Sequence, residues 1–116
     1  MSGLTTHVLD LTNGIPGAYI KIELYQINQG RDKEFLREAL TNREGRLDTP
    51  LLTSEELRQS EYELVFYIGD YFKDKGGEAP SFLTAVPVRF GVSAPSSHYH
   101  VPLLISPWGY QVYRGS

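Results

Sequence analysis

The stretch Ala18-Tyr-Ile-Lys-Ile-Glu-Leu-Tyr25 alternates between two kinds of side chain along its whole length. Its even-numbered positions are apolar, whereas Lys21 and Glu23 stand between them on the opposite face. Successive side chains of a β-strand point to opposite faces of a sheet, so this period of two predicts a strand with one buried face. The stretch decides the fold class because much of the remaining chain repeats its pattern.

The same alternation recurs at three other places. Residues 62–68, 86–92 and 99–105 each carry a row of apolar side chains at every second position. Seven or eight short strands separated by turn residues predict an all-β fold, an antiparallel sandwich with one short helix. The weaker strand candidates are residues 4–10, 35–41 and 109–114, the helix is expected at 70–75 before Gly76-Gly77, and residues 53–57 are a candidate helical turn.

Length and composition bound the class of protein. The chain has 116 residues, of which 41% are hydrophobic and 22% are charged, so we expect one globular domain over residues 1–116. Its net charge is −3 and it has no basic run, which argues against nucleic acid or an anionic membrane surface as a partner. Its apolar runs are far shorter than the roughly 20 residues of a membrane helix, so we expect no membrane span.

The chain contains no cysteine, which excludes disulfides, thiolate metal sites and a cysteine nucleophile. The N-terminal Met1-Ser2-Gly3-Leu4 does not show the basic and then apolar pattern of a secretory signal. Together these features predict a cytoplasmic protein. A nitrogen base that works near pH 7 must come from three histidines, which are His7, His98 and His100.

Strand parity places these histidines outside the core. In residues 99–105 the apolar row is odd-numbered, so His98 and His100 project from the other face. In residues 4–10 the inward row is even-numbered, so His7 also projects outward. If the first and last strands share a sheet, His7 and His100 line a common groove.

The outer face around the histidines is unusually apolar for a solvated surface. Leu9 flanks His7, and Pro102 and Leu104 follow His100 with the same parity. A contiguous apolar face on a small domain indicates contact with another subunit. We therefore expect this face to be covered in an oligomer.

A metal site is an alternative for the same histidines. His98 and His100 are two residues apart on one strand face, as in some zinc sites, and His7 is available as a third ligand. However, no Asp or Glu lies within several residues of His98 or His100 to orient the ligands. A serine triad has little support, because the chain has no Gly-x-Ser-x-Gly nucleophile turn.

Four motifs in register carry a resemblance to a known family. They are Leu4-Thr-Thr-His-Val-Leu-Asp10, Thr41-Asn-Arg-Glu-Gly-Arg46, His98-Tyr-His-Val-Pro-Leu-Leu-Ile-Ser-Pro107 and Tyr113-Arg-Gly-Ser116. In this order and over the full chain, they resemble the 5-hydroxyisourate hydrolases, the transthyretin-related enzymes of urate breakdown. The departures are mild: Glu44 stands where the family commonly has Asp, and Ile105 where it often has Leu.

The resemblance implies a fold, an assembly and an activity. The fold is a transthyretin-like sandwich of two sheets and about eight strands with one short helix, assembled as a homotetramer whose outer sheet faces meet around a channel. The activity is hydrolysis of 5-hydroxyisourate to 2-oxo-4-hydroxy-4-carboxy-5-ureidoimidazoline, with no metal and no cofactor. We therefore expect a small-molecule substrate and a cyclic-amide hydrolase.

The resemblance also implies which residues form the site. The expected catalytic residues are His7, Arg46, His100 and Ser116, and Tyr113, Arg114 and Gly115 join them in binding substrate. His98 shares a face with His100 but lies nearer the preceding loop, so we expect it outside the group that touches substrate.

Two other functions stay open. One is a transthyretin-like carrier that holds small aromatic ligands in the tetramer channel, and the other is a zinc-dependent hydrolase on the three histidines. The C-terminal tetrapeptide favours the enzyme over the carrier, because transthyretin lacks this ending together with the histidines and the arginine of the enzyme.

Overall fold

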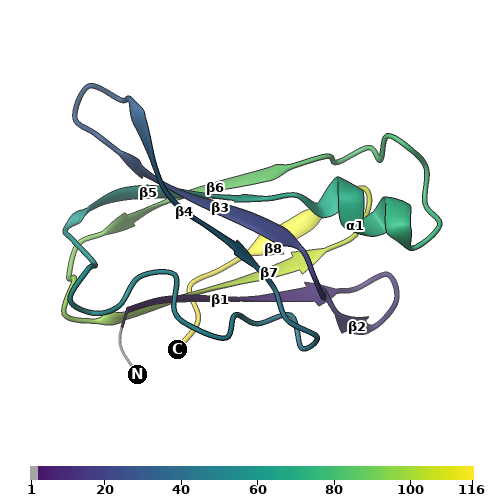
Figure 1. Cartoon of the computed structure of the whole chain (residues 1–116), viewed down its shortest axis with the longest axis horizontal. Helices are drawn as coiled ribbons and strands as arrows, with labels where there is room; N and C mark the ends of the chain where they lie inside the picture. Colours follow the sequence, from purple (N-terminus) through teal and green to yellow (C-terminus); the bar gives the residue numbers. More distant parts are fainter. Residues whose placement is uncertain (1–2) are drawn as a thin grey trace.

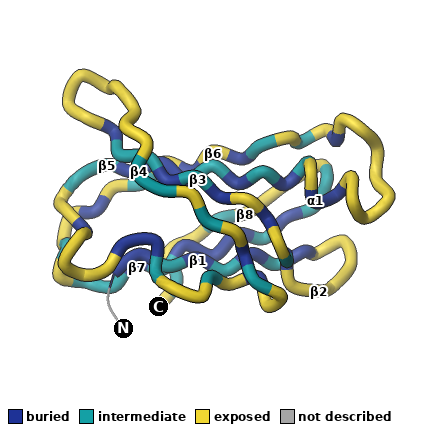
Figure 2. The backbone as a smooth tube through the Cα atoms, in the orientation of Figure 1, coloured by how far each residue is buried: buried dark blue, intermediate teal, exposed yellow. Residues whose placement is uncertain are grey.

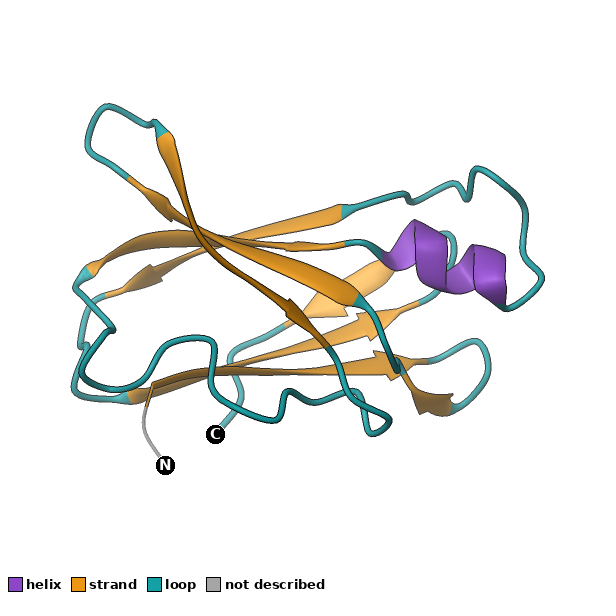
Figure 3. Ribbon diagram, in the orientation of Figure 1, coloured by secondary structure: helices purple, strands orange, loops and turns teal. Residues whose placement is uncertain are grey.

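The computed structural model describes residues 3–116, and Met1 and Ser2 at the start of the predicted domain lie outside the described residues. Two four-stranded sheets pack face to face, and one short helix lies at an end of the sandwich (Figures 1 and 3). The predicted all-β sandwich with one helix is thereby confirmed. Its elements are β1 (Gly3–Asp10), β2 (Ile15–Pro16), β3 (Lys21–Ile27), β4 (Lys33–Leu40), β5 (Ser60–Phe66), α1 (Ile68–Asp74), β6 (Val86–Val92), β7 (His98–Ile105) and β8 (Tyr110–Val112).

The first sheet has the strand order β2-β1-β7-β8. Its central pair, β1 and β7, is parallel, which departs from the antiparallel arrangement predicted for the whole sandwich. Parallel neighbours need a long connection, and here the chain passes through the entire second sheet between β1 and β7. The register pairs Thr5 with His100 and His7 with Pro102, so the outward rows of both strands lie side by side.

The second sheet has the order β4-β3-β5-β6 and is antiparallel throughout. The core lies between the two sheets, and Figure 2 shows buried residues along the central strands of both. The predicted apolar rows supply this core, and their most deeply buried members include Ile22, Leu64 and Leu103, each 0% exposed. The sequence alternation therefore assigned the inward face of each central strand correctly.

Strand ends differ from their predicted positions for local reasons. β3 begins at Lys21 and not at Ala18, because Tyr19 adopts a left-handed backbone conformation with φ 60° that interrupts extended pairing. The last strand covers Tyr110–Val112 and not residues 109–114, although Gly115 pairs again with His100 as an isolated bridge. Residues 53–57 form a single turn closed by the Leu57 N–H donating to the Thr53 carbonyl at 3.0 Å.

The helix begins two residues before its predicted start. Ile68, assigned from its parity to the preceding strand, is the first residue of α1 and is fully buried. The Tyr71 hydroxyl donates to Asp10 Oδ2 at 2.7 Å and ties the helix to the end of β1. Within residues 3–116, no helix is long and apolar enough to cross a membrane.

Candidate active site

Arg46 is brought to His7 by pairing between a turn and the edge of β1. The two residues face each other in an isolated antiparallel bridge. The turn that leads to Arg46 is fixed by Asn42, whose Oδ1 accepts the backbone N–H groups of Glu44 at 2.9 Å and Arg46 at 3.1 Å. The Asn42 backbone closes the same turn, because its N–H donates to the Arg46 carbonyl at 2.7 Å and its carbonyl accepts the Gly45 N–H at 3.0 Å. The turn therefore presents the arginine beside β1.

Gly45 allows the turn to approach β1 closely. Its φ is +77°, and its carbonyl accepts the N–H of Val8 at 2.8 Å. A Cβ at this position would lie 2.3 Å from the Val8 carbonyl oxygen, which no side chain tolerates. Glycine is thus required by both backbone conformation and contact.

His7 is held by the same turn. One ring nitrogen, Nε2, lies 3.1 Å from the Glu44 carbonyl oxygen. A carbonyl oxygen only accepts hydrogen bonds, so His7 Nε2 carries the hydrogen and donates it. In the neutral ring, Nδ1 is then the nitrogen with a free lone pair.

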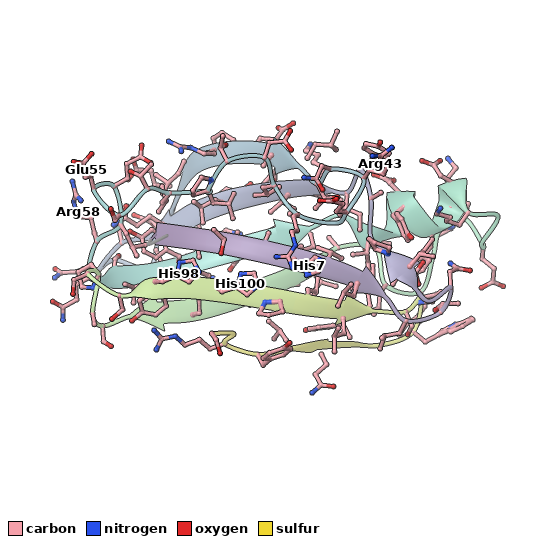
Figure 4. All side chains as sticks on the ribbon, turned by 90° about the horizontal axis from the view of Figure 1, so that it is seen from below. His7, Arg43, Glu55, Arg58, His98 and His100 are labelled. Carbon is pink, nitrogen blue, oxygen red and sulfur yellow. The ribbon has the colours of Figure 1, made fainter. Side chains whose placement is uncertain are left out.

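His98 and His100 lie on β7 beside β1, in line with His7 along the outer face of the sheet, as Figure 4 shows. The two β7 rings are nearly parallel, with an interplanar angle of 14° and centroids 6.1 Å apart. The Thr5 hydroxyl of β1 contacts both, at 2.8 Å from His100 Nδ1 and 3.4 Å from His98 Nε2. Arg43, a neighbour of Arg46 in the sequence, lies away from the histidines in the same view.

The C-terminal tetrapeptide returns to β7. The Gly115 N–H donates to the His100 carbonyl at 2.8 Å, and a Cβ on Gly115 would lie 2.7 Å from His100 Cδ2. Arg114 places its guanidinium 4.1 Å from the centre of the Tyr99 ring. The tail therefore packs against the histidine ring at a position where only glycine fits.

A surface cavity of about 310 Å³ opens between these elements. Of the predicted site residues, Arg46, His100 and Ser116 line it, whereas His7 adjoins its wall through the bridge to Arg46. Tyr113, Arg114 and Gly115 are outside the wall; Tyr113 is exposed and Arg114 covers Tyr99. The cavity wall consists of Thr5, Thr6, Arg46, Leu47, Asp48, Thr49, Pro50, His98, His100 and Ser116.

Two polar groups of the wall were not predicted to belong to the site. His98, expected outside the group that touches substrate, lines the cavity next to His100, and Thr5 connects the two rings. Parity already gave Thr5 the same outward direction as His7. The missing information was the pairing of Thr5 with His100, which depends on the parallel register of β1 and β7.

Burial and the positive charge of Arg46 lower the pKa values of His7 and His100. Desolvation lowers the pKa of His7 below its ordinary 6.5, and the Arg46 charge lowers it further. The pKa of His100 is lowered in the same way, by burial first and then by Arg46. Both imidazoles are consequently neutral at pH 7, which is the form able to accept a proton or donate a hydrogen bond.

The arrangement does not supply the ligand set of a metal site. Across residues 3–116, no three or more His, Cys, Asp or Glu side chains come together in a way that could hold a metal ion. His98 and His100 stack with parallel rings, and His7 turns its Nε2 to a backbone carbonyl. The geometry instead combines neutral imidazoles with a guanidinium, which suits binding and hydrolysis of a flat, oxygen-rich molecule.

Comparison with known proteins places this chain in a family. The HIUase/Transthyretin family matches residues 4–115. The chain is 50% identical to a 5-hydroxyisourate hydrolase of Pseudomonas aeruginosa, over 100% of this chain and 93% of the other. The structure of Klebsiella pneumoniae 5-hydroxyisourate hydrolase superposes with a TM-score of 0.81 at 34% identity, over 100% of this chain and 94% of that one.

A second structural neighbour shows how far the fold extends beyond the enzymes. Transthyretin from Sparus aurata superposes with a TM-score of 0.89 over 99% of this chain and 97% of its own, but at 20% identity. That likeness concerns the fold alone. The family match and the half-identical relative together establish that the chain belongs to the HIUase/Transthyretin family.

Proposed function

We propose that this protein hydrolyses 5-hydroxyisourate to 2-oxo-4-hydroxy-4-carboxy-5-ureidoimidazoline. The observation that carries the proposal is the meeting of Arg46 with His7 across a β-bridge, beside a cavity that His100 and Ser116 line. Relatives with about half of their residues identical bear the name of this activity. The proposed reaction opens a six-membered ring at a cyclic amide.

In the proposed reaction a water oxygen bonds to a ring carbonyl carbon and the adjacent carbon–nitrogen bond breaks. His7 acts as the base, because its Nε2–H is committed to the Glu44 carbonyl and its Nδ1 holds the free lone pair. His7 takes a proton from the attacking water and then returns it to the departing ring nitrogen. The low pKa of His7 keeps this lone pair free at pH 7.

Arg46 binds the substrate and the charge that develops on it. Its guanidinium is a planar fork of donors that matches two neighbouring oxygen atoms. The carbonyl oxygen becomes negative when water adds, so donors aimed at it lower the barrier. Arg46 lines the cavity and raises the positive potential at both histidines, which fits this role.

The C-terminal tetrapeptide completes the proposed site. Ser116 lines the cavity, and its hydroxyl contacts the substrate or the attacking water. Gly115 permits the approach of the tail to His100. Tyr113 and Arg114 act through the position of the tail, since they lie outside the wall in the single chain.

The reaction as proposed needs no metal ion and no cofactor. The base, the donors and the water supply every proton and bond that the hydrolysis of an activated amide requires. Activity in excess chelator, after extensive dialysis against it, is expected to equal that of the untreated enzyme. A loss that zinc restores would favour the zinc-dependent hydrolase on the same histidines.

The experiment that tests the function is a spectrophotometric assay on freshly generated 5-hydroxyisourate. The protein is expected to accelerate the decay of its absorbance in proportion to enzyme concentration. The matched control is the Arg43→Lys variant, because Arg43 lies away from the site and should leave the rate unchanged. Tight binding of hydrophobic aromatic ligands without acceleration of decay would favour the carrier and contradict the hydrolase.

A further inference from the structure

One hydroxyl group lies between two histidines of the cavity wall. Thr5 Oγ1 is 2.8 Å from His100 Nδ1 and 3.4 Å from His98 Nε2. A hydroxyl has a single hydrogen, so it donates to one ring and accepts from the other. The direction of this short chain therefore decides which nitrogen of each neutral ring carries its hydrogen.

The environment of His98 sets that direction. Its Nδ1 is buried and has no hydrogen-bond partner within residues 3–116. A buried N–H group without an acceptor costs more free energy than a buried nitrogen lone pair without a donor, and it is rarer in proteins. The hydrogen of neutral His98 therefore belongs on Nε2 and not on the unpartnered Nδ1. From there it donates to Thr5, and the Thr5 hydroxyl must in turn donate to His100 Nδ1.

This direction leaves the hydrogen of neutral His100 on Nε2. No described residue forms a hydrogen bond with that atom, and the residue lines the cavity. The ring is also held mechanically, with His98 stacked alongside it and the Gly115 backbone packed against its Cδ2 edge. Its donor atom is thus fixed in both identity and direction.

We propose that Thr5 and His98 are positioning residues that hold His100 as a neutral Nε2–H donor to the substrate. His100 then joins Arg46 in stabilising the developing oxyanion, and His7, whose own contact with Glu44 leaves Nδ1 bare, is the single base. His7 and His100 look equivalent in the sequence, but they take opposite roles. The Glu44 carbonyl is the partner of His7, whereas the Thr5 hydroxyl is the partner of His100. The inference about the reaction rests on the proposed function, whereas the inference about the hydrogen positions does not.

Nitrogen-15 NMR of the free protein at pH 8 tests the hydrogen positions directly, because protonated and bare ring nitrogens give well-separated signals. We expect protonated Nε2 and bare Nδ1 in His100 and His98, and the same tautomer in His7. A His100 ring with its hydrogen on Nδ1 would overturn the proposal, whatever the activity. If the tautomers are as expected but 5-hydroxyisourate is not hydrolysed, the proposed function fails and the positioning inference stands.

Variants of Thr5 then test the consequence for the reaction. Thr5→Val keeps the shape and removes the hydroxyl, so His100 is expected to populate both tautomers and kcat to fall roughly tenfold with little change in KM. Thr5→Ser restores the hydroxyl and is expected to recover activity to within about twofold of wild type. Thr12→Val is the matched control, because Thr12 is exposed and lies outside the cavity wall.

Variants of His98 separate its donor from its bulk. His98→Phe keeps an aromatic ring beside His100 but cannot donate to Thr5, and it is expected to mix the His100 tautomers and lower kcat by roughly three- to tenfold. His98→Gln retains an amide donor at a comparable reach and is expected to preserve the wild-type tautomer. Unchanged tautomers and unchanged kcat in both Thr5→Val and His98→Phe, with native circular dichroism, would overturn the positioning role.

Discussion

Burial and the positive charge of Arg46 both act on the pKa values of His7 and His100, and substitution of Arg46 separates the two effects. The pKa of His7 and the pKa of His100 are both lowered, by desolvation first and by the Arg46 charge second. A lowered pKa keeps the neutral imidazole populated at more acidic pH, so activity is retained below pH 6.5 and is lost as the pH falls through the lowered value. The positive charge of Arg46 thus acts on the histidine pKa values, whereas its paired N–H donors act on substrate binding.

We predict that Arg46→Gln moves the acid limb of the kcat/KM profile to higher pH, because both imidazoles lose a neighbouring positive charge. Arg46→Lys keeps the charge and is expected to leave the acid limb near its wild-type position. Both variants should lose roughly 10- to 100-fold in kcat/KM, since neither retains the bidentate donor. Arg43→Lys serves as the control. A wild-type rate for Arg46→Lys would show that Arg46 is only a charged residue of the turn with no role in the reaction.

His7→Ala and His100→Ala are each predicted to lower kcat by roughly 10²-fold or more. One removes the base and the other removes a donor to the oxyanion, so neither loss is compensated by substrate concentration. Both side chains project from the outer face of the sheet, and far-UV circular dichroism should therefore stay native. Near-wild-type kcat in either variant would remove that residue from the mechanism.

At the scale of elements, the site depends on three segments that meet along one strand pair. β1 contributes His7 and β7 contributes His100, while the turn ending at Arg46 and the C-terminal tail pair with the two strands through isolated bridges. Each of these two irregular segments contains a glycine whose Cβ would clash with the strand pair. Both irregular segments therefore approach the strand pair at a distance that only glycine permits.

Gly45→Ala is predicted to destabilise the protein by about 2 kcal/mol or more, because the position has a left-handed φ and the new Cβ would lie 2.3 Å from the Val8 carbonyl oxygen. The turn must retreat from β1, so Arg46 loses its place beside His7 and activity falls more than stability alone explains. Thermal unfolding and kcat/KM measure the two effects. Gly14→Ala is the control for backbone conformation, since Gly14 also has positive φ but meets nothing within 4 Å.

Deleting residues 114–116 is predicted to abolish most of the activity while leaving a folded protein. The deletion removes Ser116 from the cavity wall and Gly115 from the His100 ring, but it retains Val112, which packs against the core. Ser116→Ala should cost less, because the backbone bridge at Gly115 persists. Steady-state kinetics and circular dichroism measure the outcome; hydrolysis at the wild-type rate by the truncated chain would show that the tail has no catalytic role.

At the scale of the whole molecule, the outer face is only partly covered by the chain itself. Pro102 is buried, and a Cβ on Gly115 would lie 3.1 Å from its Cγ, whereas Leu9 and Leu104 stay half-exposed. Large aromatic side chains are exposed elsewhere, including Trp108 at 68% and Phe82 at 73%. Apolar surface of this kind on a small domain favours association into a closed assembly.

We propose a homotetramer, and light scattering is expected to give about four chain masses of 13.1 kDa each. Leu104→Glu places a charge on the outer face and should weaken the assembly while leaving the core intact. Glu34→Gln, at an exposed position of β4, is a control that should leave the mass unchanged. A stable and fully active monomer would contradict assembly around a shared channel.

The amino-acid sequence alone was sufficient for the class of fold and for the direction of most side chains. Period-two alternation assigned the inward rows of the central strands, and therefore the outward direction of His7 and His100. These are local properties, because neighbouring side chains on an extended backbone must point to opposite faces. The family resemblance added the activity and the site residues, of which the catalytic roles stay predictions.

Only the tertiary structure decided which outward residues are neighbours. The parallel register of β1 and β7 sets Thr5 beside His100, and it places His98 in the cavity wall next to them. It also set the approach of Arg46 to His7 and the packing of Gly115 on His100. Pairing between strands more than 90 residues apart depends on the whole path of the chain, so no local pattern encodes the hydrogen-bond partners that distinguish the two histidines.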